Sequence, residues 1–215
     1  MEIKYRDNDL AVVYKAANEL TQSDDKGNIG VKELLEKELN QEVYMIHRLD
    51  FQVSGLLVFA LNKKCAAILN EQVSNHETFI KEYYALVYNE LEKNSDEWID
   101  LLYKDARKNK AFVVNKKRNG VKEAKLAYKV SQELNNNISL VHIHLYTGRF
   151  HQIRVQFASR KHPLVGDGKY GAKDNEKCIG LCAYHLQFIH PMTKEVINQE
   201  IDICKEDIFK KYIEC

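Results

Sequence analysis

The stretch MIHRLDFQVSGLLVFALN, residues 45–62, passes from polar residues directly into an apolar run. Residues 55–61 have the continuous apolar pattern of a strand that is buried on both faces. Arg48 and Asp50 stand just before this strand. Desolvating an unpaired carboxylate is costly, so Asp50 is either paired for structural reasons or held for chemistry. Position alone favours the structural explanation, because ion pairs at strand ends are common.

A second stretch, YTGRFHQIRVQF at residues 146–157, places polar side chains at the start of a predicted helix. Gly148 marks a turn, and Arg149, His151 and Arg154 follow it in the first helical turns. Because backbone N–H groups at a helix start also lack intrahelical partners, these donors can bind a carboxylate or a phosphate. An amphipathic helix with a charged solvent face explains the same pattern equally well.

Alternating and helical apolar periods predict the remaining elements. We expect strands over residues 10–16, 55–62, 81–91, 97–104, 111–117, 123–134 and 138–148, helices over 30–40, 63–75 and 149–161, and a closing hairpin over 180–201. The expected fold class is α+β, with a mixed, mostly antiparallel sheet and flanking helices. No linker or repeat divides the chain, so a single domain over residues 1–215 is predicted, with the strand order left open.

The composition is that of an ordered globular protein, with 45% apolar and 29% charged residues. No apolar run approaches the roughly 18 residues that a membrane span needs, and the start lacks the pattern of a signal peptide. We therefore expect a cytoplasmic protein with no membrane partner. The five cysteines, at positions 65, 178, 182, 204 and 215, include no C-x-x-C pair, which favours reduced thiols over disulfides or a zinc site.

Positive charge is concentrated in one region, although the net charge of the whole chain is only +1. Residues 104–129 contain ten basic and two acidic residues. We predict that this segment is a hairpin, and that Lys116, Lys117 and Arg118 lie at its most basic point. Such a region can attract a polyanion to one face of the protein. A solvated lysine-rich hairpin without a partner accounts for the charge equally well.

Two further patterns are weak candidates for ligand sites. The glycines of GDGKYG, residues 166–171, match the spacing of a dinucleotide-binding loop, but no apolar helical period follows them, so we interpret them as turn residues. His142 and His144 lie on one side of a predicted strand and could bind a metal. No third ligand stands at useful spacing, so no metal site is predicted.

Five blocks together resemble the RluA-type family of RNA pseudouridine synthases. The family signature H-R-L-D-x-x-T-S-G-L-L matches HRLDFQVSGLL, and G-R-T-H-Q-I-R-V-H matches GRFHQIRVQ. The other blocks are HPLVGDGKYG, KEYYALV and HLQFIHPMTKE, and all five fall in the family's order along nearly the whole chain. Three positions depart from the pattern: Val53 and Phe150 replace threonines, and Ala16 stands where the family has a proline after lysine.

The resemblance implies a catalytic domain with a central cleft and no separate N-terminal RNA-binding domain. It also implies an isomerase that converts uridine in RNA to pseudouridine without cofactor or metal. Asp50 would be the essential carboxylate, either attacking the sugar or removing a proton near the anomeric carbon. Arg154 would pair with Asp50 and orient it. Tyr83 would stack on the uracil and could take the proton from carbon 5.

The implied partner is structured RNA, ribosomal or transfer RNA, bound by a monomer. Arg48 would hold the strand from which the target base is swung out. The other residues expected to contact RNA are His47, Arg149, His151, Lys116, Lys117 and Arg118. Two alternatives remain: a non-catalytic RNA-binding protein on the same scaffold, and a metal-dependent hydrolase built on His142, His144 and His151.

Overall fold

The computed structural model describes residues 1–75 and 77–214. The chain forms two compact units, each assembled from two segments of the sequence. Unit 1 contains Met1–Lys81 and Ala183–Ile201, and unit 2 contains Glu82–Cys182 and Asp202–Cys215. The single domain expected over residues 1–215 stays a prediction.

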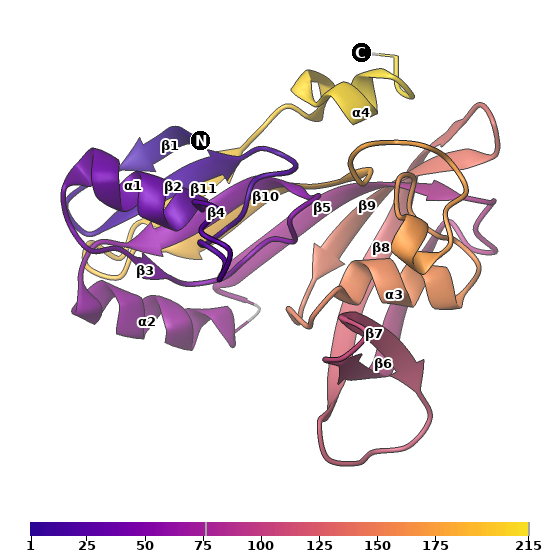
Figure 1. Ribbon diagram of the computed structural model, residues 1–215, viewed down its shortest axis with the longest axis horizontal. Coiled ribbons are helices and arrows are strands. Elements are labelled where there is room, and N and C mark those ends of the chain that lie inside the picture. Colours follow the sequence, from indigo (N-terminus) through magenta and orange to yellow (C-terminus); the bar gives the residue numbers. More distant parts are fainter. Residues whose placement is uncertain (76, 215) are drawn as a thin grey trace. The chain divides into compact units, whose positions relative to one another are not determined.

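Unit 1 is built on a sheet in which the strands follow the order β1-β2-β4-β10, with β3 beside β4 and β11 beside β10. The strands are β1 (Glu2–Arg6), β2 (Leu10–Lys15), β3 (Tyr44–Met45), β4 (Ser54–Ala60), β10 (Leu181–Ile189) and β11 (Val196–Glu200). The helices α1 (Val31–Leu39) and α2 (Lys63–Val73) lie on opposite sides of these strands (Figure 1). Every residue of β4 is buried as a result, which explains its unbroken apolar sequence.

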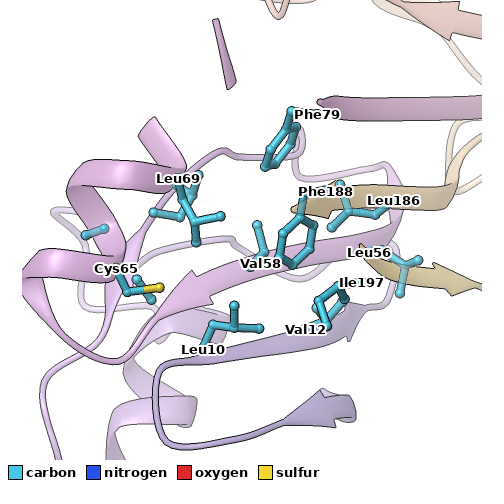
Figure 2. Packing of buried hydrophobic residues seen from close by; sticks show 13 residues of the cluster. Leu10, Val12, Leu56, Val58, Cys65, Leu69, Phe79, Leu186, Phe188 and Ile197 are labelled. Carbon is cyan, nitrogen blue, oxygen red and sulfur yellow. The ribbon is translucent and has the colours of Figure 1, made fainter. Parts of the chain in front are cut away.

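The core of unit 1 on the α2 side follows the two-residue period of the strands. Leu56, Val58 and Ala60 of β4 share this face with Leu10 and Val12 of β2, since the two strands pair antiparallel with Val12 opposite Val58. Figure 2 shows the same cluster closed by side chains of α2 and by two phenylalanines. The rings of these phenylalanines, Phe79 and Phe188, are stacked with centroids 5.6 Å apart.

Unit 2 is built on an antiparallel sheet in the order β5-β9-β8-β6-β7. Its strands are β5 (Phe79–Tyr88, of which the first three residues belong to unit 1), β6 (Ser95–Asp105), β7 (Lys110–Val114), β8 (Val121–Leu134) and β9 (Ile138–Leu145). The helix α3 (Gln152–Ser159) packs on β6 and β7 (Figure 1). Short helical turns follow at η1 (Gly168–Tyr170), η2 (Ile203–Lys205) and α4 (Asp207–Lys210).

The α+β class with flanking helices is confirmed, and every strand and helix predicted from apolar periodicity is present. One local prediction was wrong: β7 and β8 do not form a hairpin, because each pairs with β6. The segment 115–120 therefore passes from one side of β6 to the other. The period of a sequence reports which residues share a face, but it does not say which strand is the neighbour.

The cysteines follow the sequence expectation in part. Cys65, Cys178 and Cys182 are free thiols. Cys204 is disulfide-bonded, contrary to the expectation, and Cys215 lies outside the described residues. Within residues 1–75 and 77–214, no helix is long and apolar enough to cross a membrane.

Candidate functional site

Asp50 lies in the loop that leads from β3 into β4, and it is half-buried. The amide of Val53 donates to the carbonyl of Asp50 at 3.1 Å, which closes a turn immediately before β4 begins at Ser54. The carboxylate is therefore carried on the rigid end of a buried strand. Hydrogen bonds to the residues next to Asp50 hold this loop in place.

The residues on both sides of Asp50 are fixed through their main-chain groups. The carbonyl of Leu49 accepts a hydrogen bond from Oγ1 of Thr21 at 3.0 Å, and the amide of Leu49 donates to the same hydroxyl at 3.2 Å. The carbonyl of Phe51 accepts from the amide of Asn18 at 2.8 Å. Thr21 is buried, so water does not compete for its two bonds to Leu49.

Lys15 supplies the third anchor of this loop, and its side chain is fully buried. Its ammonium group donates to three carbonyl oxygens, those of Glu19 at 2.8 Å, Ala16 at 2.9 Å and Phe51 at 3.2 Å. A buried ammonium group is tolerated where its donors are satisfied in this way. The sequence analysis missed Lys15, although the lysine of the family's N-terminal pattern was a signal for it.

Gly55, the second residue of β4, has a φ of +133°. A Cβ atom at this position would lie 2.4 Å from the carbonyl oxygen of Ala183 in β10. The close approach of β4 and β10 therefore requires glycine, which accounts for the glycine in the HRLDFQVSGLL block.

His47 and Arg48, which precede Asp50, differ in their surroundings. Arg48 is exposed, whereas His47 is half-buried, with its ring edge-on to Phe79 at 5.9 Å. Nε2 of His47 accepts from the amide of Val58 at 3.4 Å. Burial, together with the charge of Lys81, lowers the pKa of His47 to about 3, so the ring is neutral near pH 7. These contacts give His47 a packing role, and its contact with RNA stays a prediction.

In unit 2, Arg154 forms an ion pair with Asp167. Nε of Arg154 donates to Oδ2 at 2.7 Å and Nη2 donates to Oδ1 at 2.9 Å, a two-point contact that fixes the plane of the guanidinium group. Arg154 and Asp167 are only 4% and 1% exposed. The guanidinium group also lies 5.2 Å from the ring centre of Tyr170. Asp167 and Tyr170 belong to GDGKYG, a stretch whose glycines we interpreted as turn residues and which is part of the HPLVGDGKYG block.

His151 begins α3 with a backbone in the left-handed region, at φ +51°. Its ring is buried, stacks on Phe150 at 3.8 Å, and places Nδ1 3.1 Å from the hydroxyl of Tyr170. The ammonium group of Lys104 lies 4.4 Å from the ring centre of Phe150. His151 thus helps to position Tyr170, and its contact with RNA stays a prediction.

Gln152 fixes the turn that leads into α3. Its Oε1 accepts from Oγ1 of Thr147 at 2.7 Å and from the amide of Arg149 at 3.0 Å, and its Nε2 donates to the carbonyl of Lys125. The side chain of Arg149 is exposed, and its Nε donates to the carbonyl of Glu123 at 2.8 Å. The helix start is therefore held in place from both β8 and the turn.

Tyr83 lies in β5 opposite Ile143 of β9, and its side chain is buried. Unit 2 therefore carries both Tyr83 and Arg154, whereas Asp50 belongs to unit 1. The predicted ion pair between Arg154 and Asp50 stays a prediction.

Lys116, Lys117 and Arg118 lie in the exposed segment between β7 and β8. The guanidinium group of Arg118 rests over the ring of Tyr103 at 4.7 Å. The same pairing of cation and ring occurs at Lys125 and Tyr146, at 4.6 Å. Cations are thus paired with aromatic rings at both β6 and β8 of unit 2.

Two of the three histidines of the metal-hydrolase alternative lie beside one carboxylate: Nε2 of His142 is 3.6 Å and Nδ1 of His144 is 3.5 Å from Oε1 of Glu82. Among the described residues, the acids and histidines with ligand atoms close enough to share an ion are Asp7, Asp9 and His190. Nδ1 of His190 accepts the amides of Met192 and Thr193, so its proton is on Nε2, which donates to Asp7 at 2.8 Å. Both ring nitrogens therefore have hydrogen-bond partners, and these contacts account for the cluster without an ion.

Comparison with known proteins gives a consistent result. The model of the family described as RNA pseudouridylate synthase matches residues 9–159. The tRNA pseudouridine synthase C of Haemophilus ducreyi is 30% identical over 92% of this chain and 89% of its own length. An uncharacterized RNA pseudouridine synthase of Bacillus subtilis, YhcT, is 31% identical over 93% of this chain and 68% of its own length.

Solved structures share the fold. The human protein RNA Pseudouridylate Synthase Domain Containing 1 superposes with a TM-score of 0.77, at 23% identity, over 94% of this chain and 82% of that one. The human protein RNA Pseudouridylate Synthase Domain Containing 4 superposes with a TM-score of 0.78, at 19% identity, over 99% of this chain and 94% of that one.

Proposed function

Because the chain belongs to the RNA pseudouridylate synthase family, a family of isomerases, we propose that it converts specific uridines of ribosomal or transfer RNA to pseudouridine in the cytoplasm. The observation that carries the proposal is the Asp50 loop. A half-buried carboxylate stands at the end of a buried strand, and the side chains of Lys15 and Thr21 donate hydrogen bonds to the main-chain carbonyls on both sides of it. Such preorganisation is what a reacting carboxylate needs.

In the proposed reaction the bond between N1 of uracil and C1′ of the ribose breaks. The uracil then turns within the site, and a bond forms between C5 and C1′. C5 loses its proton and N1 gains one, so the product is an isomer of the substrate. Asp50 either attacks C1′ or removes a proton next to it, and both routes use the ionised carboxylate.

The other proposed roles follow from the chemistry of each side chain. Arg154 pairs with Asp50, Tyr83 stacks on the uracil and accepts the C5 proton, and Arg48 occupies the gap that the flipped base leaves. The ion pair with Asp167 supports the role of Arg154, because it fixes the plane of the guanidinium group. No step in this scheme uses a cofactor or a metal.

The first prediction concerns Asp50. Changing Asp50→Ala should abolish pseudouridine formation and leave the fold intact, because Asp50 is half-buried and lies outside the strand core. Carbodiimide mapping of pseudouridine in cellular RNA, with and without the protein, measures the activity and identifies the target. Asp207→Asn, at an exposed position in α4, is the control and should keep full activity. Near-normal turnover by Asp50→Ala would refute the proposed role.

The same experiment separates catalysis from binding. A non-catalytic RNA-binding protein would give identical RNA maps with the wild type and with Asp50→Ala, while both bound RNA equally well. An isomerase would give pseudouridine sites that appear in the map with the wild type and are absent from the map with Asp50→Ala.

The second prediction concerns the segment that carries Lys116, Lys117 and Arg118, which we expect to contact phosphates. Replacing all three with alanine should weaken RNA binding and reduce the slope of log affinity against log salt by roughly 0.7–0.9 per lost contact. Single-turnover chemistry at saturating RNA should change little. Exposed lysines of unit 1, changed together, serve as a charge-matched control: Lys37, Lys63 and Lys64. Equal slopes of log affinity against log salt for the two triple variants would show that the segment does not contact RNA phosphates.

A further inference from the structure

Unit 1 contains a cavity of about 530 Å³ beside the Asp50 loop. The loop that joins β2 to α1 forms one wall, through Leu20 and Ile29, and α1 adds Leu34. The lining also includes Phe51, the residue that directly follows Asp50. No role in the proposed reaction requires this cavity.

The cavity gathers exposed apolar side chains. Ile29, Leu34 and Phe51 are 66%, 38% and 50% exposed, and they make up half of the large hydrophobic residues exposed among those that the structure describes. Scattered exposed apolar residues are ordinary, but a group of them around one cavity marks a binding surface.

Two parts of the cavity lining are fixed before any ligand binds. Phe51 is held through its carbonyl, which accepts from Lys15 and Asn18. In the loop before α1, a Cβ atom at Gly30 would lie 2.3 Å from the main chain of Gln22, so the loop lies directly against the start of α1. The aromatic ring is therefore presented by a rigid main chain, which lowers the entropic cost of binding.

The chemistry of the lining favours a flat, neutral ligand over a phosphate. The residues that line the cavity, all within the described part of the chain, include no lysine or arginine. Its acidic members are Glu19 and Asp24. Asp24 accepts from the amides of Lys26 and Asn28 and from the side chain of Asn28. An anion would meet negative charge here, whereas a nucleobase offers N–H donors and a face that stacks on an aromatic ring.

We propose that this cavity binds the nucleobase next to the target uridine, stacked on Phe51. The proposal rests on the proposed function, because it places the sugar of the target at Asp50. Phe51 directly follows Asp50, and consecutive Cα atoms are about 3.8 Å apart, so a nucleotide held at Asp50 has its neighbour within reach of the residue that carries the ring. Continuity with Asp50, the rigid ring and the absence of positive charge in the lining all point to the same occupant.

The test uses a six-nucleotide RNA with one uridine between two 2-aminopurines, bound to the full chain carrying Asp50→Asn so that no turnover occurs. We expect 2-aminopurine fluorescence to be quenched on binding. Adding Phe51→Leu, which keeps an apolar side chain but removes the ring, should weaken Kd about five- to tenfold. Phe51→Trp should restore it. Val196→Ala, at an exposed valine of β11 outside the cavity, is the control and should not alter Kd.

A second probe set replaces the 2-aminopurine on one side or the other with an abasic nucleotide. One of the two abasic replacements should weaken binding by the same factor as Phe51→Leu. Combining that abasic probe with the Phe51→Leu protein should raise Kd no further than either change alone. Kd values within twofold for both abasic probes would overturn the proposal. A wild-type dimer in sedimentation that Phe51→Leu dissociates would also overturn it, by assigning the cavity to a second copy.

The outcome is separable from that of the proposed function. Suppose that probe binding depends on the Phe51 ring, but the pseudouridine maps of cellular RNA are the same with and without the protein. This result would reject the proposed isomerase activity and keep the proposed base site. Pseudouridine formation that Phe51→Leu leaves untouched, with unchanged Kd, would reject the base site and keep the isomerase.

Discussion

Asp50 and Arg154, one in each unit, are held in place by different kinds of interaction. The residues beside Asp50 are bound through main-chain amides and carbonyls, with Thr21 and Lys15 as the anchoring side chains. Arg154 is held by another side-chain charge, that of Asp167, in a two-point ion pair. The main chain on both sides of Asp50 is held by hydrogen bonds, whereas the side chain of Arg154 is held by the charge of Asp167.

The difference predicts how each region fails. Loss of a main-chain anchor frees the loop and misplaces the carboxylate. The main effect should therefore be on catalytic activity. Loss of Asp167 changes the charge balance of a buried site, so stability should suffer most.

The largest effect is expected for Asp167→Asn. This change removes a negative charge against the buried guanidinium group of Arg154, and breaking such a pair from one side typically costs about 3–5 kcal/mol. Urea unfolding should show this loss. The double variant Asp167→Asn with Arg154→Met should recover part of the lost unfolding free energy, because it no longer buries the unpaired guanidinium charge of Arg154. A loss below about 1 kcal/mol for Asp167→Asn would mean that the pair is not what holds Arg154.

A smaller loss of stability, about 2–4 kcal/mol, is expected for Lys15→Met, which removes three hydrogen bonds from a buried ammonium group to main-chain carbonyls. Because Phe51 loses an anchor, kcat should fall further than the loss of stability alone explains, while KM changes little. Lys4→Met, at an exposed lysine of β1, is the matched control. Equal kcat values for the folded fractions of the two variants would show that Lys15 stabilises unit 1 without positioning Asp50.

The smallest effect concerns pH and His47. The pKa of His47 is lowered to about 3 in the folded protein, below the usual 6.5, so between these values the unfolded chain binds more protons. Stability should therefore fall as pH drops below 6.5, by up to about 1.4 kcal/mol per pH unit. His47→Gln, which keeps an acceptor for the Val58 amide, should show a shallower slope in urea unfolding between pH 7 and pH 5. An unchanged slope would place the titrating group elsewhere.

Local sequence patterns predicted the elements that carry both groups. The apolar run of β4 placed Asp50 at a strand end, and the change to a helical period after Gly148 placed Arg154 at the start of α3. These patterns work because burial repeats every two or 3.6 residues.

The anchors were missed because they depend on residues far apart in the sequence. Lys15 looks like an ordinary charged residue at a strand end, and nothing near it shows that a carbonyl 36 residues away will accept a hydrogen bond from it. Asp167 stands in a glycine-rich turn, where an aspartate usually satisfies local amides. The pairing of β7 and β8 with β6 was misjudged for the same reason, since strand neighbours are set by tertiary packing.

The order of the two units along the chain has a consequence for biosynthesis. Unit 1 begins at Met1 but needs β10 and β11, and its core includes Leu186, Phe188 and Ile197. A nascent chain that ends near residue 81 therefore exposes the apolar faces of β4 and α2 without their partners. At about 5–20 residues per second, the roughly 100 residues of unit 2 that intervene delay completion of this core by about 5–20 s. Unit 1 is begun first on the ribosome and must remain unfinished while most of unit 2 is made.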